Sequence, residues 1–133
     1  MGTLKQYRIL VVDNNKTYID VLKFQLSDVM LDSIEYLDEA YHGLHAIELV
    51  HDKTYDIVFM DIDMPILDGI DTTKFLRLNY PDLKVVALSL YCDEEHISSM
   101  LQAGADGYLV KDNLDDVAII EIFQSLDFVV RDE

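Results

Sequence analysis

Four side chains that carry an acid, a hydroxyl or an ammonium group each follow a short apolar run: Asp13, Asp61, Ser89 and Lys111. Unbroken apolar runs of this length are typical of parallel strands that are buried on both faces. In open sheets of parallel strands, ligands bind outside the carboxyl ends of the strands. These four groups are therefore expected where a side chain can react with a ligand or bind it.

The stretch around Asp61 shows how the chain presents such a group. The apolar residues 57–60 lead directly into Asp61, which is expected at the carboxyl end of a strand. Pro65 fixes its own φ and restricts Met64, so the chain must turn after the strand. Asp68-Gly69 is a turn dipeptide that leads toward a helix over about residues 71–79.

Expected strands and helices alternate along the whole sequence. Strands are expected at residues 7–12, 34–40, 57–61, 84–89 and 107–111, and the acids within 34–40 favour an edge position for that strand. Helices are expected at residues 16–29, 43–51 and 71–79, between the cap Asp93 and Gly104, and from the cap Asn113 to about Val130. We expect Leu44 and Leu101 on buried helix faces. The alternation predicts an α/β fold, a doubly wound five-stranded parallel sheet with five helices on its two faces.

Composition limits the possible functions. The chain has 133 residues, half of them hydrophobic, which is enough for one domain with a proper core. Because 26 acidic residues face 10 basic ones, giving a formal charge of -16, the domain is expected to bind neither nucleic acid nor an anionic membrane directly. A single cysteine, Cys92, excludes an internal disulfide, and no leader or long apolar run is present, so the cytoplasm is the expected location.

Several conspicuous polar residues are expected to have ordinary structural roles. His42, His45, His51 and His96 are scattered and lack metal-ligand spacing, so we interpret them as structural or solvated. Cys92 has no evident cationic partner and is interpreted as a loop thiol. The acids at 93–95 and 115–116 are expected to favour the first turns of helices.

Taken together, the motifs resemble one known family. The pair Asp13-Asn14, the run Asp61-Ile62-Asp63-Met64-Pro65 with Asp68-Gly69, Ser89 after Val-Ala-Leu, and the segment 107–111 resemble the receiver domain of bacterial two-component response regulators. The resemblance covers about residues 7–126, and we expect one receiver domain over residues 1–133. It implies a flavodoxin-like sheet with strand order 2-1-3-4-5. The Lys111-Asp112 pair resembles the subgroup whose receivers precede a helix-turn-helix domain, which implies a possible DNA-binding output domain beyond the given chain.

The resemblance also implies roles for individual residues. Asp61 would be the phosphoacceptor, a carboxylate nucleophile that takes a phosphoryl group from a sensor histidine kinase. The domain would then be a signalling switch that catalyses only its own phosphorylation and dephosphorylation. Mg²⁺ or Mn²⁺ would be held by Asp13, Asn14, Asp61 and Asp63, the last through its backbone carbonyl or its side chain. The remaining roles are Lys111 as the cation on the phosphoryl oxygens, Ser89 as the hydroxyl that reaches for the phosphoryl group, Tyr108 as the aromatic switch and Tyr91 as a pocket-lining residue.

The expected last helix has more apolar residues than one core-facing stripe requires. These residues are Val117, Ala118, Ile119, Ile120, Ile122, Phe123, Leu126, Phe128, Val129 and Val130. Part of this surface should meet a partner. In receivers, the face made by the fourth helix, fifth strand and fifth helix commonly does so, which implies a homodimer or an output contact there.

One residue departs from the family pattern. Receivers usually have two adjacent acids after the first strand, but the second position here is Asn14. An amide oxygen can still bind a metal, but the missing charge predicts weaker magnesium affinity and less efficient phosphorylation. Asn14→Asp is therefore expected to tighten magnesium binding by about tenfold.

Two other functions remain open at this point. A pseudo-receiver, which is an interaction domain with a vestigial pocket, would also account for Asn14. Asp61-Ile62-Asp63 resembles the opening of haloacid dehalogenase-type phosphatases as well. That class expects a hydroxyl residue soon after the second acid, where this chain has Met64-Pro65. It also expects a late pair of acids at the metal site, but no acid pair ends a late strand here.

Overall fold

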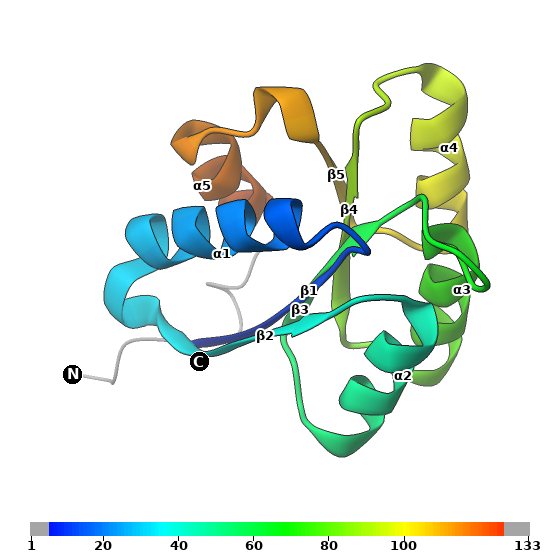
Figure 1. Ribbon diagram of the computed structural model, residues 1–133, viewed down its shortest axis with the longest axis horizontal. Helices are drawn as coiled ribbons and strands as arrows, with labels where there is room; N and C mark the ends of the chain where they lie inside the picture. Colours follow the sequence, from blue (N-terminus) through cyan, green and yellow to red (C-terminus); the bar gives the residue numbers. More distant parts are fainter. Residues whose placement is uncertain (1–5, 127–133) are drawn as a thin grey trace.

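A five-stranded parallel sheet forms the centre of the molecule, with strand order β2-β1-β3-β4-β5 (Figure 1). The structure is a computed structural model, and it describes residues 6–126. The strands are β1 (Tyr7–Val12), β2 (Ile34–Ala40), β3 (Ile57–Asp61), β4 (Lys84–Ser89) and β5 (Gly107–Val110). This arrangement confirms the predicted fold and the edge position of β2. Because all neighbouring strands are parallel, their carboxyl ends meet at one edge of the sheet.

Helices cover both faces of the sheet (Figure 1). The helices are α1 (Lys16–Met30), α2 (Gly43–Asp52), α3 (Gly69–Asn79), α4 (Glu94–Ala103) and α5 (Asp116–Ser125), with short 3₁₀ turns at η1 (Leu31–Ser33) and η2 (Lys111–Asn113). Helices α1 and α5 lie on one face, and α2, α3 and α4 lie on the other. No helix within residues 6–126 combines the length and the apolar character that crossing a membrane requires.

The side chains of each central strand alternate between two separate apolar layers. Leu10 and Val58 belong to the layer under α2, α3 and α4, whereas their neighbours Ile9 and Ile57 belong to the layer under α1 and α5. All four are fully buried. Burying an aliphatic side chain of this size contributes roughly 1.5–3 kcal/mol, which explains why unbroken apolar runs form the central strands.

Two helix starts differ from the prediction. Helix α3 begins at Gly69 instead of residue 71, because the Asp68 side chain accepts a hydrogen bond from the Asp71 amide at 2.9 Å and caps the helix. Helix α5 begins at Asp116, and its cap is Asp115 instead of Asn113. Residues 111–113 form the 3₁₀ turn instead, which delays the helix.

Two predicted core residues lie on the surface. Leu44 is 50% exposed and Leu101 is 48% exposed, because Ala46 and Met100 fill the buried positions of the same helices. Phe128, Val129 and Val130 of the predicted last helix lie outside the described residues.

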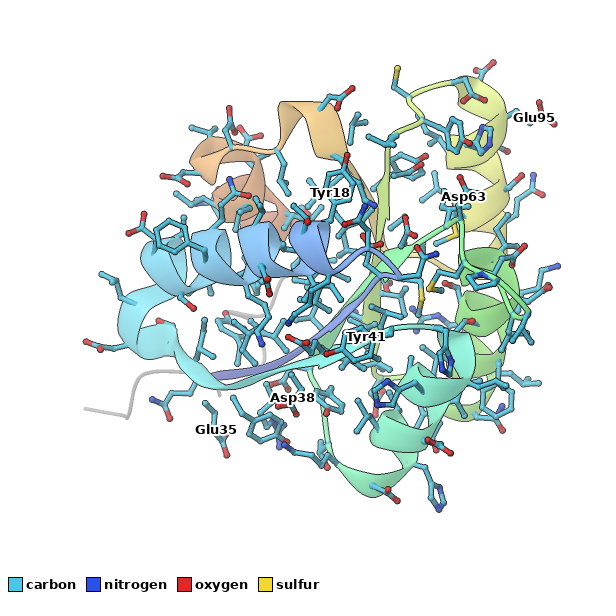
Figure 2. All side chains as sticks on the ribbon, viewed as in Figure 1. Tyr18, Glu35, Asp38, Tyr41, Asp63 and Glu95 are labelled. Carbon is cyan, nitrogen blue, oxygen red and sulfur yellow. The ribbon has the colours of Figure 1, made fainter. Side chains whose placement is uncertain are left out.

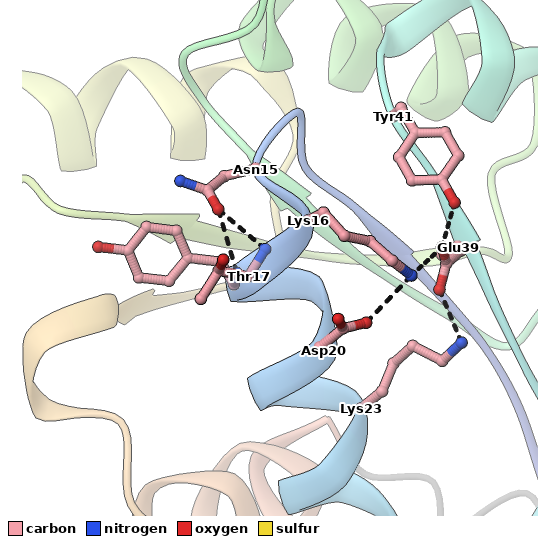
Figure 3. A network of polar contacts seen from close by, with 8 residues as sticks. Asn15, Lys16, Thr17, Asp20, Lys23, Glu39 and Tyr41 are labelled. Atoms are coloured by element: carbon pink, nitrogen blue, oxygen red, sulfur yellow. Dashed lines mark hydrogen bonds and ion pairs between the residues drawn. The ribbon is translucent and has the colours of Figure 1, made fainter.

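A network of charges ties edge strand β2 to helix α1 (Figure 3). The Glu39 carboxylate accepts hydrogen bonds from the ammonium groups of Lys16 at 2.7 Å and Lys23 at 2.8 Å, and the Tyr41 hydroxyl donates to it as well. The hydrogen bond from Lys16, followed by those from Lys23 and Tyr41, lowers the pKa of Glu39 to about 2. Glu39 therefore stabilises the folded state while it is ionised.

Glu39→Gln is expected to lower the free energy of unfolding at neutral pH by about 1 kcal/mol, after solvent screening is taken into account. Because folding lowers this pKa, the stabilisation is fully present above the ordinary pKa of 4.5 and is lost as the pH falls toward about 2. Urea unfolding at about pH 7 and about pH 3 measures the effect, with Glu35→Gln on the exposed side of β2 as the control. If Glu39→Gln and Glu35→Gln lowered the free energy of unfolding equally, the charge network would not be the source of the stabilisation.

Candidate functional site

The carboxyl ends of the strands surround a cavity of about 150 Å³. Its lining residues come from the ends of β1, β3, β4 and β5 and from the start of α1, and they are Asp13, Asn14, Asn15, Tyr18, Asp61, Asp63, Ser89, Leu90 and Lys111. Figure 2 shows two of them, Tyr18 and Asp63, near this end of the sheet. The structure thus brings together all four side chains that follow the apolar runs.

The loop after β3 holds Asp61 through a close backbone approach. The Gly69 amide donates a hydrogen bond to the Ile62 carbonyl at 2.8 Å. A Cβ atom at Gly69 would lie 2.1 Å from the Asp61 carbonyl oxygen, so only glycine fits against the end of this strand. Between them, Ile66 adopts the left-handed region at φ 71°, which is strained for a β-branched residue, and its side chain is 90% exposed.

Lys111 lies between the two buried acids. Its Nζ atom is 2.7 Å from Asp13 Oδ2 and 3.1 Å from Asp61 Oδ1. The same Nζ lies 4.1 Å from the centre of the Tyr18 ring, within the range of a cation–π interaction. The ammonium group thereby lies beside Asp61, where it can neutralise a negatively charged group attached to that carboxylate.

Two carboxylates share this one cation, and the pKa values reflect it. Burial, supported by the charge of Asp13 and opposed by Lys111, raises the pKa of Asp61 to about 7. Burial acts to lower the pKa of Lys111, but its close ion pair with Asp13 and the negative charge of Asp61 outweigh burial and raise that pKa. The site therefore holds excess negative charge that a further cation would neutralise.

The oxygen atoms of the cavity fit a hydrated magnesium ion. Asp13 Oδ1 accepts the Asn15 amide at 2.9 Å, but Asp13 Oδ2 is buried and has no aligned hydrogen-bond donor, although it is ion-paired with Lys111. Mg²⁺ is usually bound by one or two carboxylates and keeps several waters. Asp13 and Asp61, with the amide oxygen of Asn14, offer such a set.

Asp63 stands apart from these two acids. Its side chain is exposed, and its interaction with the Tyr91 hydroxyl raises the pKa of that phenol. Within residues 6–126, no three His, Cys, Asp or Glu side chains converge as a metal-binding group. A metal ion in this cavity would therefore meet the two buried carboxylates of Asp13 and Asp61, with Asp63 at the more exposed side.

The loop after β4 links Ser89 to Tyr108. The Ser89 Oγ accepts the Tyr91 amide at 3.0 Å, and the half-buried Tyr108 donates its hydroxyl to the Tyr91 carbonyl at 2.9 Å. Tyr91 itself is not among the residues that line the cavity, but its amide bonds to Ser89, which does line it. A change at Ser89 can thus reach β5 through two hydrogen bonds.

Sequence reasoning missed Tyr18 and Leu90 as cavity residues. Tyr18 lies one turn after the helix cap Asn15, whose side chain accepts the Thr17 amide at 2.9 Å (Figure 3). The first turn of a helix that follows a strand end faces the same edge of the sheet as that strand end. This position was the available signal for Tyr18, whereas its contact with Lys111 depends on the folded arrangement of α1 and β5.

Asn14→Asp is expected to tighten magnesium binding by about tenfold, because it adds a negative charge beside the carboxylates of Asp13 and Asp61. Desolvation offsets most of the Coulomb attraction between this charge and the ion, which is why the expected gain is no larger. The same change should lower the stability of the metal-free protein, since Asn14 lies beside Asp13 and Asp61 in the cavity. A calorimetric magnesium titration measures the affinity. Asn79→Asp, a distant exposed residue, is the matched charge control. Equal affinities of Asn14→Asp and the control would show that residue 14 does not contact the ion.

Comparison with known proteins adds an independent finding. The family model described as "Response regulator receiver domain" matches residues 9–124. The "Transcriptional regulatory protein DegU" of Brevibacillus brevis is 35% identical over 114 residues, which cover 86% of this chain and 47% of that protein. The "Chemotaxis protein CheY" of Halobacterium salinarum is 31% identical, with 78% of this chain and 83% of that protein covered. The crystal structure of a two-component response regulator from Clostridium difficile has a TM-score of 0.81 at 26% identity, with 93% of this chain and 98% of that chain covered. The chain spans about half the length of the first curated relatives that it matches.

Proposed function

The chain belongs to the response regulator receiver domain family, and we propose that it is a switch that accepts a phosphoryl group from a histidine kinase on Asp61. Receiver domains are in general switches and not enzymes with an external substrate, and they typically bind Mg²⁺ in an acidic pocket. The observation that carries the proposal is the buried Asp61 carboxylate, held at the end of β3 and facing Lys111 and Asp13.

The residues of the cavity support this chemistry. An Asp61 oxygen attacks the phosphorus atom of the donor, a P–O bond forms, and the bond from phosphorus to the donor breaks, with its electron pair leaving on the donor. Lys111 neutralises charge on the phosphoryl oxygens, and the Ser89 hydroxyl at the neighbouring strand end can donate a hydrogen bond to them. Asp13, Asp61 and Asn14 would hold magnesium, which would supply further positive charge to the transferring group.

The test is phosphorylation of the protein by acetyl phosphate in the presence of magnesium, followed by intact-mass measurement. We expect one phosphoryl group per chain, and none when a chelator removes the metal. Borohydride converts an aspartyl phosphate into homoserine, so peptide mass spectrometry after reduction should find homoserine at position 61.

Other results would contradict the proposal or support one of the two other functions, the pseudo-receiver and the phosphatase. Homoserine at another position would contradict the role of Asp61. No uptake, either from acetyl phosphate or from histidine kinases, would establish the pseudo-receiver. Steady turnover of a phosphomonoester would establish a phosphatase.

We further infer an output contact on the face formed by α4, β5 and α5. Within the described residues, Leu101 on α4 is 48% exposed, and Val117 and Ile120 on α5 are 61% and 43% exposed. In such a contact, Tyr108 on β5 would connect the face to Ser89 through the Tyr91 backbone. The partner is a second copy of the chain or an output domain, and the latter would be a DNA-binding domain as in transcriptional regulators.

Beryllium fluoride, which mimics the phosphoryl group on aspartate, is expected to shift the chain from monomer to dimer in sedimentation velocity. Ile120→Glu should weaken the dimer by about tenfold or more, because it places a charge in an apolar contact. Phe24→Glu on α1, where Phe24 is 73% exposed, is the matched control. Equal weakening by both substitutions would contradict the assignment of the face.

A further inference from the structure

Tyr18 and Lys111 line two neighbouring cavities. One is the cavity of about 150 Å³ that contains Asp61. The other, of about 170 Å³, lies among α1, β4 and the segment after β5, and its lining includes the buried side chains of Leu22 and Leu88. The pair of Tyr18 and Lys111 therefore stands between the reactive carboxylate and a second, more apolar space.

The Lys111 ammonium group has three close neighbours. Its Nζ atom lies 2.7 Å from Asp13 Oδ2, 3.1 Å from Asp61 Oδ1 and 4.1 Å from the centre of the Tyr18 ring. The Lys111 side chain is only 7% exposed, so little water reaches it. Two negative charges and one neutral ring thus enclose the ammonium group.

The ring attracts the ammonium group without neutralising it. The face of an aromatic ring carries partial negative charge, and its attraction for a cation is stronger where water is excluded. A third carboxylate would hold Lys111 more tightly, but it would compete with a phosphoryl group for the positive charge. The ring also fills space that water would otherwise occupy, and water would weaken the attraction between Lys111 and the phosphoryl oxygens.

The contact uses the ring of Tyr18 and not its hydroxyl. Within residues 6–126, the Tyr18 hydroxyl has no hydrogen-bond partner, whereas the ring faces Lys111. The backbone of Tyr18 is fixed by the start of α1, because the Asn15 side chain accepts the amides of Thr17 at 2.9 Å and of Tyr18 at 3.4 Å. The helix cap therefore sets the point from which the ring reaches Lys111.

We propose that Tyr18 is a positioning residue for phosphoryl transfer to Asp61, because its ring holds the Lys111 ammonium group beside Asp61 and keeps water from that side. This inference rests on the proposed function. In the transfer, a bond forms between an Asp61 oxygen and phosphorus, and the bond from phosphorus to the donor breaks with its electron pair leaving on the donor. Tyr18 takes no part in these bonds and acts through Lys111.

The contact can be tested without any phosphorylation. In the metal-free protein, the ring current of Tyr18 should shift the resonances of the Lys111 ammonium and ε-methylene protons upfield. Tyr18→Leu should remove this shift, while Phe24→Leu, which removes a 73% exposed ring from the same helix, should leave it unchanged. Equal Lys111 resonances in the wild type and Tyr18→Leu would overturn the contact, whatever the outcome of the phosphorylation experiment.

The role of the ring is tested by the rate at which acetyl phosphate phosphorylates the protein in the presence of magnesium. Because this donor is small, protein docking on α1 does not enter the rate. Tyr18→Leu, which stays apolar but lacks the ring, should react about five- to tenfold more slowly than the control Phe24→Leu. Tyr18→Phe keeps the ring and should recover most of this loss.

Fluorination separates the attraction of the ring from its shape. Fluorine atoms withdraw electron density from the ring face and weaken its attraction for a cation, but they change the size of the ring little. Phenylalanine and its mono-, di- and trifluorinated analogues, placed at position 18, should therefore react progressively more slowly. A merely structural role of Tyr18 would give the same rate for all four.

Equal rates across the fluorinated series, or equal rates of Tyr18→Leu and Tyr18→Phe, would overturn the positioning role even if the ring-current shift is present. If the wild type takes up no phosphoryl group, the proposed function fails and the role of Tyr18 in the transfer fails with it. The ring-current experiment then still decides whether Tyr18 holds Lys111.

Discussion

Replacing Asp61 by asparagine is expected to abolish phosphoryl uptake and to raise the free energy of unfolding of the metal-free protein at about pH 8 by about 2 kcal/mol. The first effect follows from the loss of the nucleophilic oxygen. The second follows because Asp61 and Asp13 are both buried and share the single ammonium group of Lys111. Asparagine keeps the shape of the side chain but removes one of the two competing charges.

The size and pH dependence of this gain follow from the pKa of Asp61. Burial raises it from 3.8 to about 7, a difference of about three pH units, and each unit corresponds to about 1.4 kcal/mol. Solvent relaxation around the site reduces the resulting limit of about 4 kcal/mol by about half. Because the pKa is raised on folding, the folded state is penalised only when the unfolded state has released its proton. The gain from Asp61→Asn is therefore absent below about pH 4, grows as the pH rises, and is complete above about pH 7.

Urea unfolding of the wild type and Asp61→Asn at about pH 4 and about pH 8, in the presence of a chelator, measures this difference. Asp82→Asn, an exposed acid before β4, is the control for net charge. Magnesium should stabilise the wild type more than Asp61→Asn, because it neutralises the charge that the variant lacks. If Asp61→Asn were less stable than the wild type at both pH values, repulsion between the carboxylates of Asp13 and Asp61 would not destabilise the folded protein.

Gly69→Ala is expected to lower the free energy of unfolding by about 3 kcal/mol and to slow phosphorylation of Asp61. The added Cβ would lie 2.1 Å from the Asp61 carbonyl oxygen and 2.8 Å from the Ile62 Cα. Both are backbone atoms, so the end of β3 must move away from helix α3. The higher helix propensity of alanine, up to about 1 kcal/mol, offsets only part of this cost.

Thermal or urea unfolding gives the stability change, and the acetyl phosphate reaction gives the rate of phosphorylation. Lys74→Ala, at an exposed position of the same helix, is the matched control and should change neither quantity by much. If Gly69→Ala matched this control in stability, the loop would be able to relax around a Cβ, and the close approach would not be what positions Asp61.

The strands and the four central site residues were predictable because the signal for them is local. An apolar run that ends in a polar residue identifies both the strand and its functional end, as in residues 57–61, and the structure places Asp13, Asp61, Ser89 and Lys111 around one cavity as expected. The strand order had no such local signal and came from the family resemblance.

Choices between equivalent local signals could not be made from the sequence. Asn113 and Asp115 can both cap a helix, and the 3₁₀ turn after β5 selects Asp115. Leu44 is apolar in an amphipathic helix, but the helix orientation on the sheet buries Ala46 instead. Tertiary packing settles such cases, because it decides which of several suitable residues faces the core.

Contacts that depend on the folded path of the chain were also beyond the sequence pattern. The contact of Tyr18 with Lys111 joins the first helix to the end of the fifth strand. His96 was interpreted as structural or solvated, and its stack on Tyr91 depends on the path of the loop before α4. Neither contact follows from the types and spacing of its two residues alone.

The division of the interior into two apolar layers has an evolutionary consequence. Neighbouring residues of one strand, such as Leu10 and Ile9, pack under different sets of helices, and the sheet backbone separates the two sets. A substitution that reshapes the layer under α1 and α5 therefore leaves the side-chain packing under α2, α3 and α4 unchanged. Substitutions in the two layers can consequently be selected separately, because the side chains of one layer do not pack against those of the other.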